Sequence, residues 1–278
     1  MDQKILVFAG KKQSGKSSSA NFVSGYILAQ MGRRGNPSCP NNFSIEDDGS
    51  LIVDTVISDV DGNKAIEGGI LDLSRRDEDF VNWAYSILWP TVKTYAFADE
   101  LKKIATIVFN IDPALVYGSD EDKNTPIHIK WKDMCVFLAP RKINDLKKSE
   151  KYDKRMTVRE FLQFFGTNVC RVLDDNCWTR TCFNKIIGEG SELAIIQDCR
   201  FANEVKAAKK VGAKVIKLTR SVQFDAHESE NDLDKMGNDQ FDLVIDNEYL
   251  TIREKNVAIL NFLYEVGWLT GHVGLENV

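Results

Sequence analysis

The chain has 278 residues, of which 43% are hydrophobic and 28% are charged, as expected for a soluble globular protein with one large α/β domain or two small ones. The 36 basic and 41 acidic residues give a net charge of −5, which argues against polymeric nucleic acid as a partner but does not exclude small anionic ligands. No apolar run reaches the ~20 residues of a membrane span, and we find neither a signal peptide nor a CxxC pair. We therefore expect reduced thiols and a cytoplasmic location.

Strand and helix patterns alternate along the chain. Residues 4–9 (KILVFA) form a short strand-like run, and an apolar face predicts a helix from Lys16 to about Gly32. Two strand-like segments flank the turn at 61–63, which predicts a β-hairpin in an insert over 41–75. Further strands are expected at 91–97, 192–197, 214–219 and 241–247, and further helices at 77–88, 98–109, 157–187, 203–213 and 253–267.

The segment 110–155 contains three prolines and a basic run, and we expect it to be largely irregular and mobile, with room for one short helix. Thr157, followed three residues later by Glu160, predicts a capping box that starts the next helix. The alternation of strands and helices over the rest of the chain predicts parallel βαβ units in a layered α/β fold.

The stretch GKKQSGKS, residues 10–17, fits the phosphate-loop pattern GxxxxGK[ST], with a predicted strand before it and a predicted helix after it. Glycines allow the backbone N–H groups to wrap an anion, and the helix N-terminus adds a favourable dipole. Lys16 is expected to bridge the β- and γ-phosphates, and Ser17 to ligate Mg²⁺. The alternative is a surface turn rich in glycine, serine and lysine. The expected nucleotide-binding residues are Gly10, Lys12, Ser14, Gly15, Lys16, Ser17 and Ser18.

Later segments place charged and amide side chains where an acceptor could bind. Arg159 and Gln163 are four residues apart, on one face of a predicted helix. Asp198 and Arg200 are expected just past the carboxyl end of a buried strand, where ligand sites of α/β proteins form. The remaining segments are YAFADELKK (95–103), LTR (218–220), HESE (227–230) and FDLVIDN (241–247).

Together with the loop, these segments resemble the phage-type deoxynucleoside monophosphate kinases, within the adenylate-kinase-like P-loop group. The matching pieces are GKKQSGK, FADELK, VREFLQFFGTN, DCRFANEV, KKVGAKVI, and HESE followed by FDLVIDN, in that order. Dephospho-CoA and phosphomevalonate kinases share the architecture, so the acceptor is less firmly indicated than the reaction. GTN stands where GTD is more frequent, which leaves no carboxylate at Asn168, and FADEL stands where FADPL is more frequent.

The resemblance implies a three-layer P-loop kinase fold with a parallel sheet of about five strands. It implies a single kinase domain over 1–278 with the hairpin insert at 41–75 and a mobile lid at about 221–240. ATP and Mg²⁺ would be the cofactors, small-molecule nucleotides the partners, and a phage origin would place the protein in the host cytoplasm. Whether the chain forms a homodimer stays open.

The resemblance also suggests roles on the acceptor side. Arg159 would bind the acceptor phosphate and Gln163 the base, against the alternative of a solvated arginine and a surface amide. Asp99 would hold the acceptor sugar, accept its proton or merely cap a helix, with Lys102 nearby in the substrate site. The expected catalytic residues are Lys16, Asp99, Arg159 and Arg200.

For three further residues the sequence leaves more than one role open. Arg200 is expected to bind an anion rather than to be solvated, and Asp198 either to orient Mg²⁺ through water or to pair with Arg200. Arg220 would stack on adenine or reach the phosphates, or be only a charge at a strand end.

Two other functions stay in view. One is a P-loop kinase that acts on a modified base in DNA or on a non-nucleotide phosphate. The other is a nucleotide-binding protein that has lost catalysis, against which the intact Lys16 and Ser17 argue.

Overall fold

The computed structural model describes residues 3–58, 64–220 and 232–269. The chain divides into two compact units, unit 1 (Met1–Ala96 with Lys185–Val278) and unit 2 (Phe97–Asn184), and each is described by itself. None of the described helices offers a stretch long and apolar enough to cross a membrane.

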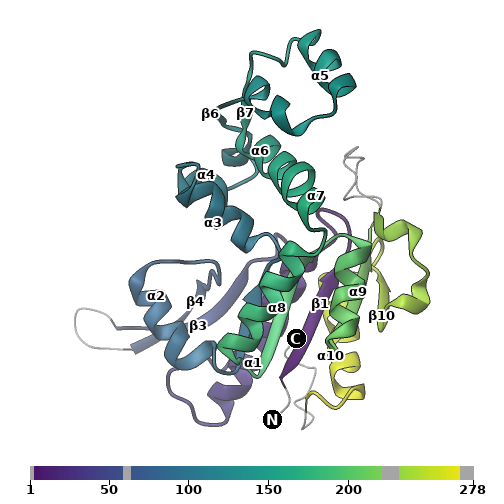
Figure 1. The fold of residues 1–278 in the computed structure, drawn as a ribbon. Coiled ribbons are helices and arrows are strands. Elements are labelled where there is room, and N and C mark those ends of the chain that lie inside the picture. Colours follow the sequence, from purple (N-terminus) through teal and green to yellow (C-terminus); the bar gives the residue numbers. More distant parts are fainter. Residues whose placement is uncertain (1–2, 59–63, 221–231, 270–278) are drawn as a thin grey trace. The chain divides into compact units, whose positions relative to one another are not determined.

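Unit 1 is organised around a parallel sheet, in which the described residues supply five strands in the order β10-β9-β1-β8-β5 (Figure 1). The central strand β1 pairs with β8 on one side and with β9 on the other. The strands β1 and β8, at the centre of the sheet, consist largely of buried apolar residues because both faces of the sheet are covered. They are β1 (Lys4–Ala9), β5 (Val92–Tyr95), β8 (Leu193–Cys199), β9 (Lys214–Thr219) and β10 (Leu243–Asp246).

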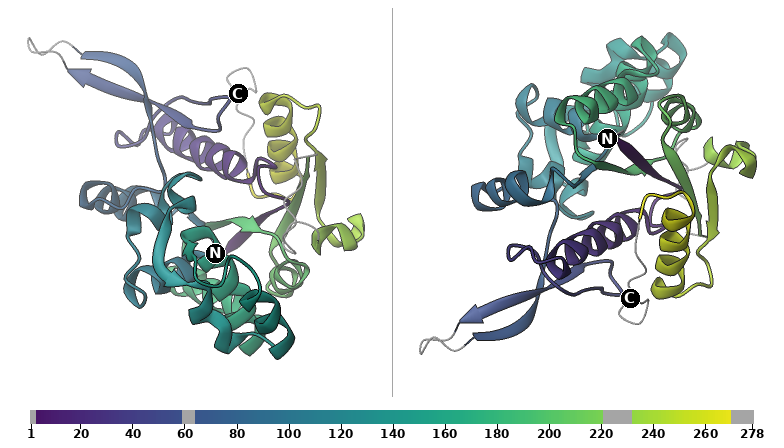
Figure 2. Two further views of the ribbon diagram at one scale, coloured as in Figure 1. Left: turned by 90° about the horizontal axis from the view of Figure 1, so that it is seen from above. Right: turned by 90° about the horizontal axis from the view of Figure 1, so that it is seen from below.

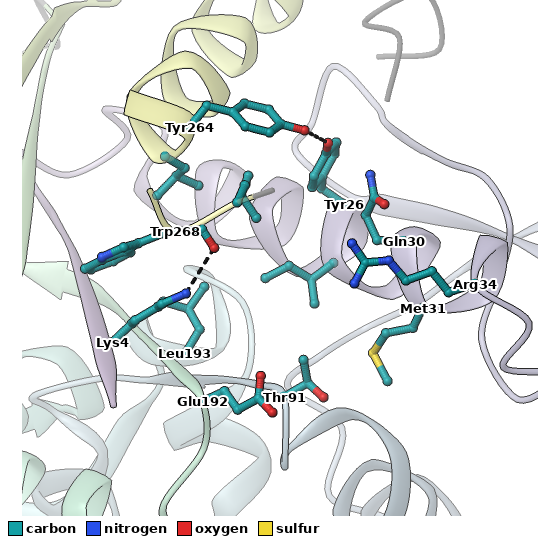
Figure 3. A pocket seen from close by; sticks show the side chains of 13 residues that line it. Lys4, Tyr26, Gln30, Met31, Arg34, Thr91, Glu192, Leu193, Tyr264 and Trp268 are labelled. Atoms are coloured by element: carbon teal, nitrogen blue, oxygen red, sulfur yellow. Dashed lines mark hydrogen bonds between the residues drawn. The ribbon is translucent and has the colours of Figure 1, made fainter. Parts of the chain in front are cut away.

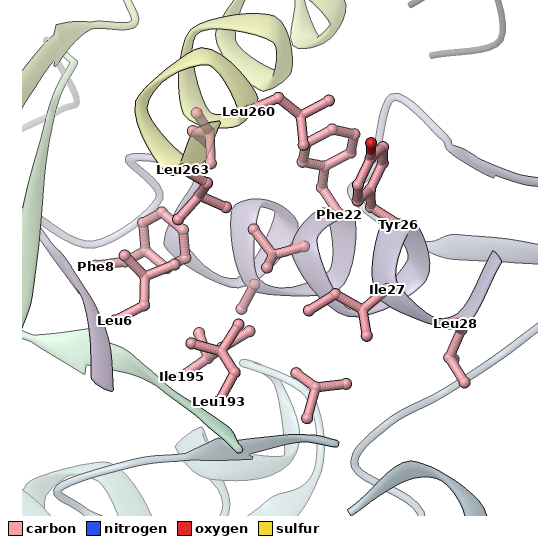
Figure 4. Close-up of a cluster of buried hydrophobic side chains, with 14 of the residues drawn as sticks. Leu6, Phe8, Phe22, Tyr26, Ile27, Leu28, Leu193, Ile195, Leu260 and Leu263 are labelled. Carbon is pink, nitrogen blue, oxygen red and sulfur yellow. The ribbon is translucent and has the colours of Figure 1, made fainter. Parts of the chain in front are cut away.

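Helices lie on both faces of this sheet (Figure 2). On one face pack α1 (Lys16–Arg33) and α10 (Ile252–Glu265), whose apolar side chains join those of the strands in one buried cluster (Figure 4). On the other face lie α9 (Ala202–Lys210) and the last turn of α8 (Cys177–Glu189), which begins in unit 2. The predicted three-layer α/β fold with its parallel sheet is therefore confirmed.

An antiparallel sheet is inserted after α1. It contains β2 (Phe43–Ile45), β3 (Leu51–Ser58) and β4 (Lys64–Ile70), and the β3–β4 hairpin extends away from the parallel sheet (Figure 2). The base of this sheet packs on α1 through Phe43 and Leu51. A Cβ on Gly25 would lie 2.5 Å from Leu51 and 2.7 Å from Phe43, so this close approach requires a glycine. The remaining elements of unit 1 are α2 (Glu78–Trp83), the π-helix η1 (Ala84–Leu88) and the 3₁₀-helices η6 (Asp232–Lys235) and η7 (Asn238–Gln240).

Unit 2 has a hydrophobic core of its own. The helices α3 (Asp99–Ile107) and α6 (Val158–Phe164) pack together. The segment that follows α6 approaches α3 at Gly166, where a Cβ would lie 2.7 Å from Leu101. The two described strands pair antiparallel. The other elements are α4 (Pro113–Tyr117), η2 (Asp122–Asn124), β6 (Pro126–Lys130), η3 (Trp131–Phe137), α5 (Pro140–Lys147), β7 (Arg155–Thr157), η4 (Phe165–Cys170) and α7 (Arg171–Leu173).

Most of the predicted elements are confirmed, but the expectation that 110–155 is largely irregular is wrong. Its scattered apolar side chains, among them Ile111, Val116 and Ile127, are buried in one cluster with Met156 and Phe161. These residues are spaced too widely to give a clear helical or strand period, so the elements that contain them could not be predicted from the sequence. The capping box at the start of α6 is present, with the Thr157 and Glu160 side chains each accepting from the other residue's backbone N–H.

Candidate functional site

The glycine-rich loop joins β1 to α1 at the carboxyl edge of the sheet in unit 1. Its backbone has φ of +152° at Gly10 and +94° at Gly15, in the region that favours glycine. A Cβ on Gly10 would lie 2.5 Å from the Leu218 carbonyl oxygen. No side chain caps α1, and its first turn contains no acidic residue, so the positive end of the helix keeps its attraction for an anion.

Lys16 is folded back over this loop and is only 6% exposed. Its ammonium donates to the Gly10 carbonyl at 2.7 Å and to the Lys11 carbonyl, so oxygens of the loop itself accept hydrogen bonds from it. Ser14 is buried, and Ser17 is exposed. Lys12 and Ser18 are half-buried. The predicted loop residues thus occupy one continuous turn at the start of α1.

Two residues to which the sequence analysis gave no role contact the loop through their side chains. The Asn247 side chain donates to the Ser14 carbonyl at 2.9 Å, and the Lys255 ammonium donates to the Ser18 hydroxyl at 3.1 Å. Burial, and then the Arg220 charge, lower the pKa of Lys255 to about 8. Lys255 stands four residues before Ile259, on the buried face of α10, and this spacing could have marked it as an inward-facing lysine.

The end of β8 brings two of the predicted charges beside the loop. β8 runs to Cys199, so Asp198 is inside the strand rather than just past it, and Arg200 follows the strand. The Cys199 thiol is buried, which raises its pKa well above the ordinary value; the Glu204 and Asp198 carboxylates raise it further, and the Lys16 ammonium opposes them. The charges of Asp198 and Lys16 therefore act on the same buried thiol in opposite directions.

A cavity of about 250 Å³ lies beside the loop, at the carboxyl ends of β9 and β10. Arg220 is exposed and lines this cavity, together with Gly10 and Lys11 of the loop. An ion pair of 2.8 Å joins Lys11 to Asp234 in η6, at the cavity wall. The first part of the expected lid, 221–231, lies outside the described residues, and so does His227 within it.

The residues around the loop fit a Mg²⁺ ion for which phosphate oxygens of a nucleotide would supply most of the ligands. Ser17 offers an exposed hydroxyl and Asp198 a half-buried carboxylate. Among the described residues no group of three or more histidine, cysteine, aspartate or glutamate side chains could hold a metal ion. Mg²⁺ prefers one or two protein ligands together with phosphate oxygens and waters in such sites, so this small donor set agrees with its chemistry.

The predicted acceptor residues Arg159 and Gln163 lie on α6 in unit 2. The Arg159 guanidinium donates to Asp120 at 2.7 Å and to the Asn124 side chain at 3.2 Å. Asp120 is more than half exposed, and such surface pairs contribute only ~0–1 kcal/mol, so a phosphate dianion could displace it. Gln163 is half-buried, and no hydrogen bond to its side chain is found among the described residues.

Asp99 and Lys102 lie on α3, in the same unit. Asp99 is the first residue of the helix and Ala98 occupies the cap position, so the alternative that Asp99 is the cap is wrong. The carboxylate still lies at the positive end of the helix. The Lys102 ammonium lies 5.4 Å from the centre of the Tyr117 ring.

A second cavity, of about 170 Å³, opens near the amino ends of β1 and β8 (Figure 3). The Tyr26 and Tyr264 hydroxyls meet there at 2.5 Å, and burial and this contact raise the pKa of Tyr26 to about 12. None of the predicted site residues lines this cavity. Ligands of open parallel sheets bind at the carboxyl ends of the strands, so we assign no part of the candidate site to it.

Comparisons with known proteins agree with the resemblance drawn from the motifs. Residues 124–254 match the family model "Deoxynucleotide monophosphate kinase". A curated protein of Acanthamoeba polyphaga mimivirus, named provisionally as a deoxynucleotide monophosphate kinase, is 28% identical over 155 residues, which cover 50% of this chain and 67% of the relative. The resemblance to deoxynucleotide monophosphate kinases is therefore confirmed.

Proposed function

We propose that this chain transfers the γ-phosphate of ATP to a deoxynucleoside monophosphate and releases the diphosphate and ADP. The observation that carries the proposal is the buried Lys16 in a glycine loop between a parallel strand and an uncapped helix. The match of residues 124–254 to a deoxynucleotide monophosphate kinase family supports the choice of acceptor. The proposal places this reaction in the cytoplasm.

On the donor side, phosphoryl transfer requires the protein mainly to position two anions in line and to neutralise the charge that develops. Lys16 would exchange its loop carbonyls for β- and γ-phosphate oxygens. The loop residues Gly10, Lys12, Ser14, Gly15 and Ser18 would surround the phosphates. Arg220, which lines the neighbouring cavity, would contact the adenine or the phosphates.

Mg²⁺ would be held by the Ser17 hydroxyl and, through water, by Asp198, and it would supply positive charge to the phosphate oxygens. Arg200 would bind a phosphate group from the end of β8. The assignment of Asp198 is supported by the pairing of β8 with β1, which brings Cys199, the residue after Asp198, opposite Ala9 at the start of the loop.

On the acceptor side, Arg159 would bind the monophosphate after releasing Asp120, and Gln163 would donate to or accept from the base. The half-buried Gln163 amide, without a described hydrogen bond, supports this role because its polar atoms can still be satisfied by a ligand. Asp99 and Lys102, on the adjacent α3, would contact the acceptor sugar and phosphate.

The proposal is tested by coupling ADP release to a spectrophotometric signal, with ATP, Mg²⁺ and a panel of deoxynucleoside monophosphates. We expect turnover with at least one acceptor and only a slow background without one. ATP binding by the folded protein, without turnover on any nucleotide acceptor, would favour the catalytically inactive alternative. Turnover only on a phosphorylated non-nucleotide, or binding to DNA that weakens steeply with salt, would favour the alternative acceptors.

A further inference from the structure

Lys255 is a lysine in an unusual place. It belongs to the buried face of α10, beside Ile259 and Leu260 of the main core, and it is only 2% exposed. Lysines are almost never fully buried unless their charge is paired. The position of this ammonium therefore needs an explanation beyond packing.

The Lys255 ammonium points at the start of α1. It donates to the Ser18 hydroxyl at 3.1 Å, and a Cβ placed on Gly15 would lie 3.6 Å from it. Gly15 and Ser18 flank Lys16 and Ser17 in the glycine-rich loop. A cation from the last helix of unit 1 thus reaches the same turn that the loop motif predicts to bind phosphate.

Among the described residues, no negatively charged group pairs with the Lys255 ammonium. Within the described part of the chain no carboxylate lies within ion-pair distance of it, and the charge that acts on it is another cation, Arg220. Its only described side-chain partner is a neutral hydroxyl. A buried ammonium that is directed at the loop, and whose described side-chain partner is neutral, would have its charge compensated by a bound anion.

Other buried or paired lysines of unit 1 differ in this respect. Lys217 is 7% exposed, but it donates to the Leu233 carbonyl and lies 5.0 Å from the centre of the Phe241 ring. Lys209 pairs with Asp242 at 2.6 Å on the surface. Lys255 is thus distinguished by its position at the loop and by its lack of a described acidic or carbonyl partner.

We propose that Lys255 is a phosphate-binding residue of the donor site, and that its ammonium binds the triphosphate chain of the nucleotide next to the Ser18 hydroxyl. The proposal deepens the proposed function, on which it rests for the identity of the loop as the donor site. The ligand class is a polyphosphate chain, because the contact is made by charge at the loop and not by a pocket for a base.

The test compares the binding of ATP and of inorganic tripolyphosphate to the wild type and to the variants Lys255→Met, Ser18→Ala and Lys209→Met, by isothermal titration calorimetry. Lys255→Met should weaken both ligands about tenfold or more, because it removes a charge-assisted contact and keeps the volume of the side chain. Lys209→Met is the matched control and should bind both ligands as the wild type does.

A purely structural role predicts a different pattern. If Lys255 only fixes Ser18, then Ser18→Ala reproduces the loss of affinity, and both variants lower the Tm of the ligand-free protein. The proposal instead predicts that Lys255→Met raises this Tm and weakens ATP more than Ser18→Ala does. Wild-type affinity in Lys255→Met for both ligands would overturn it.

If Lys255→Met does not fold, calorimetry on the wild type tests whether Lys255 binds the phosphates. Calorimetry at pH 8 in buffers of different ionisation enthalpy should then show proton uptake when ATP binds, since a bound phosphate favours the charged ammonium. An absence of proton uptake would overturn the proposal. A protein that binds ATP in this way but phosphorylates no monophosphate would refute only the proposed function, whereas a wild type that binds neither ligand would refute both.

Discussion

Replacing Lys255 by methionine should stabilise the ligand-free protein, and the gain should depend on pH. Burial lowers the pKa of Lys255 from 10.5 to about 8, so charging this group in the folded state costs on the order of 3 kcal/mol, at ~1.36 kcal/mol for each pKa unit. Methionine removes this cost but also loses the hydrogen bond to Ser18, worth about 1 kcal/mol. The expected net gain in the free energy of unfolding at pH 7 is therefore about 2 kcal/mol.

The sign of the pH dependence follows from linkage. Below pH 8 Lys255 is charged in both the folded and the unfolded protein, so the wild type bears the full free-energy cost of burying this charge. Between pH 8 and 10.5 the unfolded chain keeps a proton that the folded protein releases, so the wild type gains stability relative to the variant. Groups such as Tyr26, whose pKa is raised to about 12, titrate in both proteins and cancel in the difference.

Urea denaturation of the two proteins at pH 7 and at pH 10, without nucleotide, measures this difference. The advantage of Lys255→Met should be largest at pH 7 and much smaller at pH 10. A variant that is less stable than the wild type at pH 7 would contradict the reasoning, and so would a gain of the same size at both pH values.

Three further variants test the two halves of the candidate site. Lys16→Ala should abolish phosphoryl transfer, measured as ADP release, while the far-UV circular dichroism of the protein stays unchanged; appreciable residual turnover would remove Lys16 from the mechanism. Asn247→Ala leaves the Ser14 carbonyl without its donor, at a cost of about 1–3 kcal/mol, so the Kd for ATP should rise about tenfold in a titration, and an unchanged Kd would mean that the loop holds its shape alone. Arg159→Ala should raise the KM for the acceptor about tenfold or more, with a smaller effect on kcat, whereas Asp120→Asn should not raise this KM because it releases the guanidinium. Unaltered acceptor kinetics in Arg159→Ala would show that the acceptor phosphate binds elsewhere.

The parallel core could be predicted from the sequence because its signals are local. β1 is an uninterrupted apolar run, and the glycines that follow it are required by φ values that other residues rarely adopt. The strands expected at 192–197 and 214–219 correspond to β8 and β9 within about two residues. A period of two or of 3.6 residues is visible in such segments without any knowledge of what they contact.

The features that the sequence did not reveal depend on contacts between distant segments. Asn247 and Lys255 approach the loop only because β10 and α10 lie next to β9 and α1 in the folded unit. The ion pair between Arg159 and Asp120 joins residues 39 positions apart. The order within 110–155 likewise comes from a shared core, to which α4, β6 and η3 each contribute only two or three side chains.

The most direct test of the proposed reaction follows the phosphoryl group itself. The protein is incubated with Mg²⁺, ATP labelled at its γ-phosphate and each deoxynucleoside monophosphate in turn, and the products are separated by chromatography. The proposal predicts that label appears in the β-phosphate of a deoxynucleoside diphosphate, in amounts equal to the ADP formed, and that Lys16→Ala gives none. Label that appears only in inorganic phosphate, or in no nucleotide product at all, would contradict it.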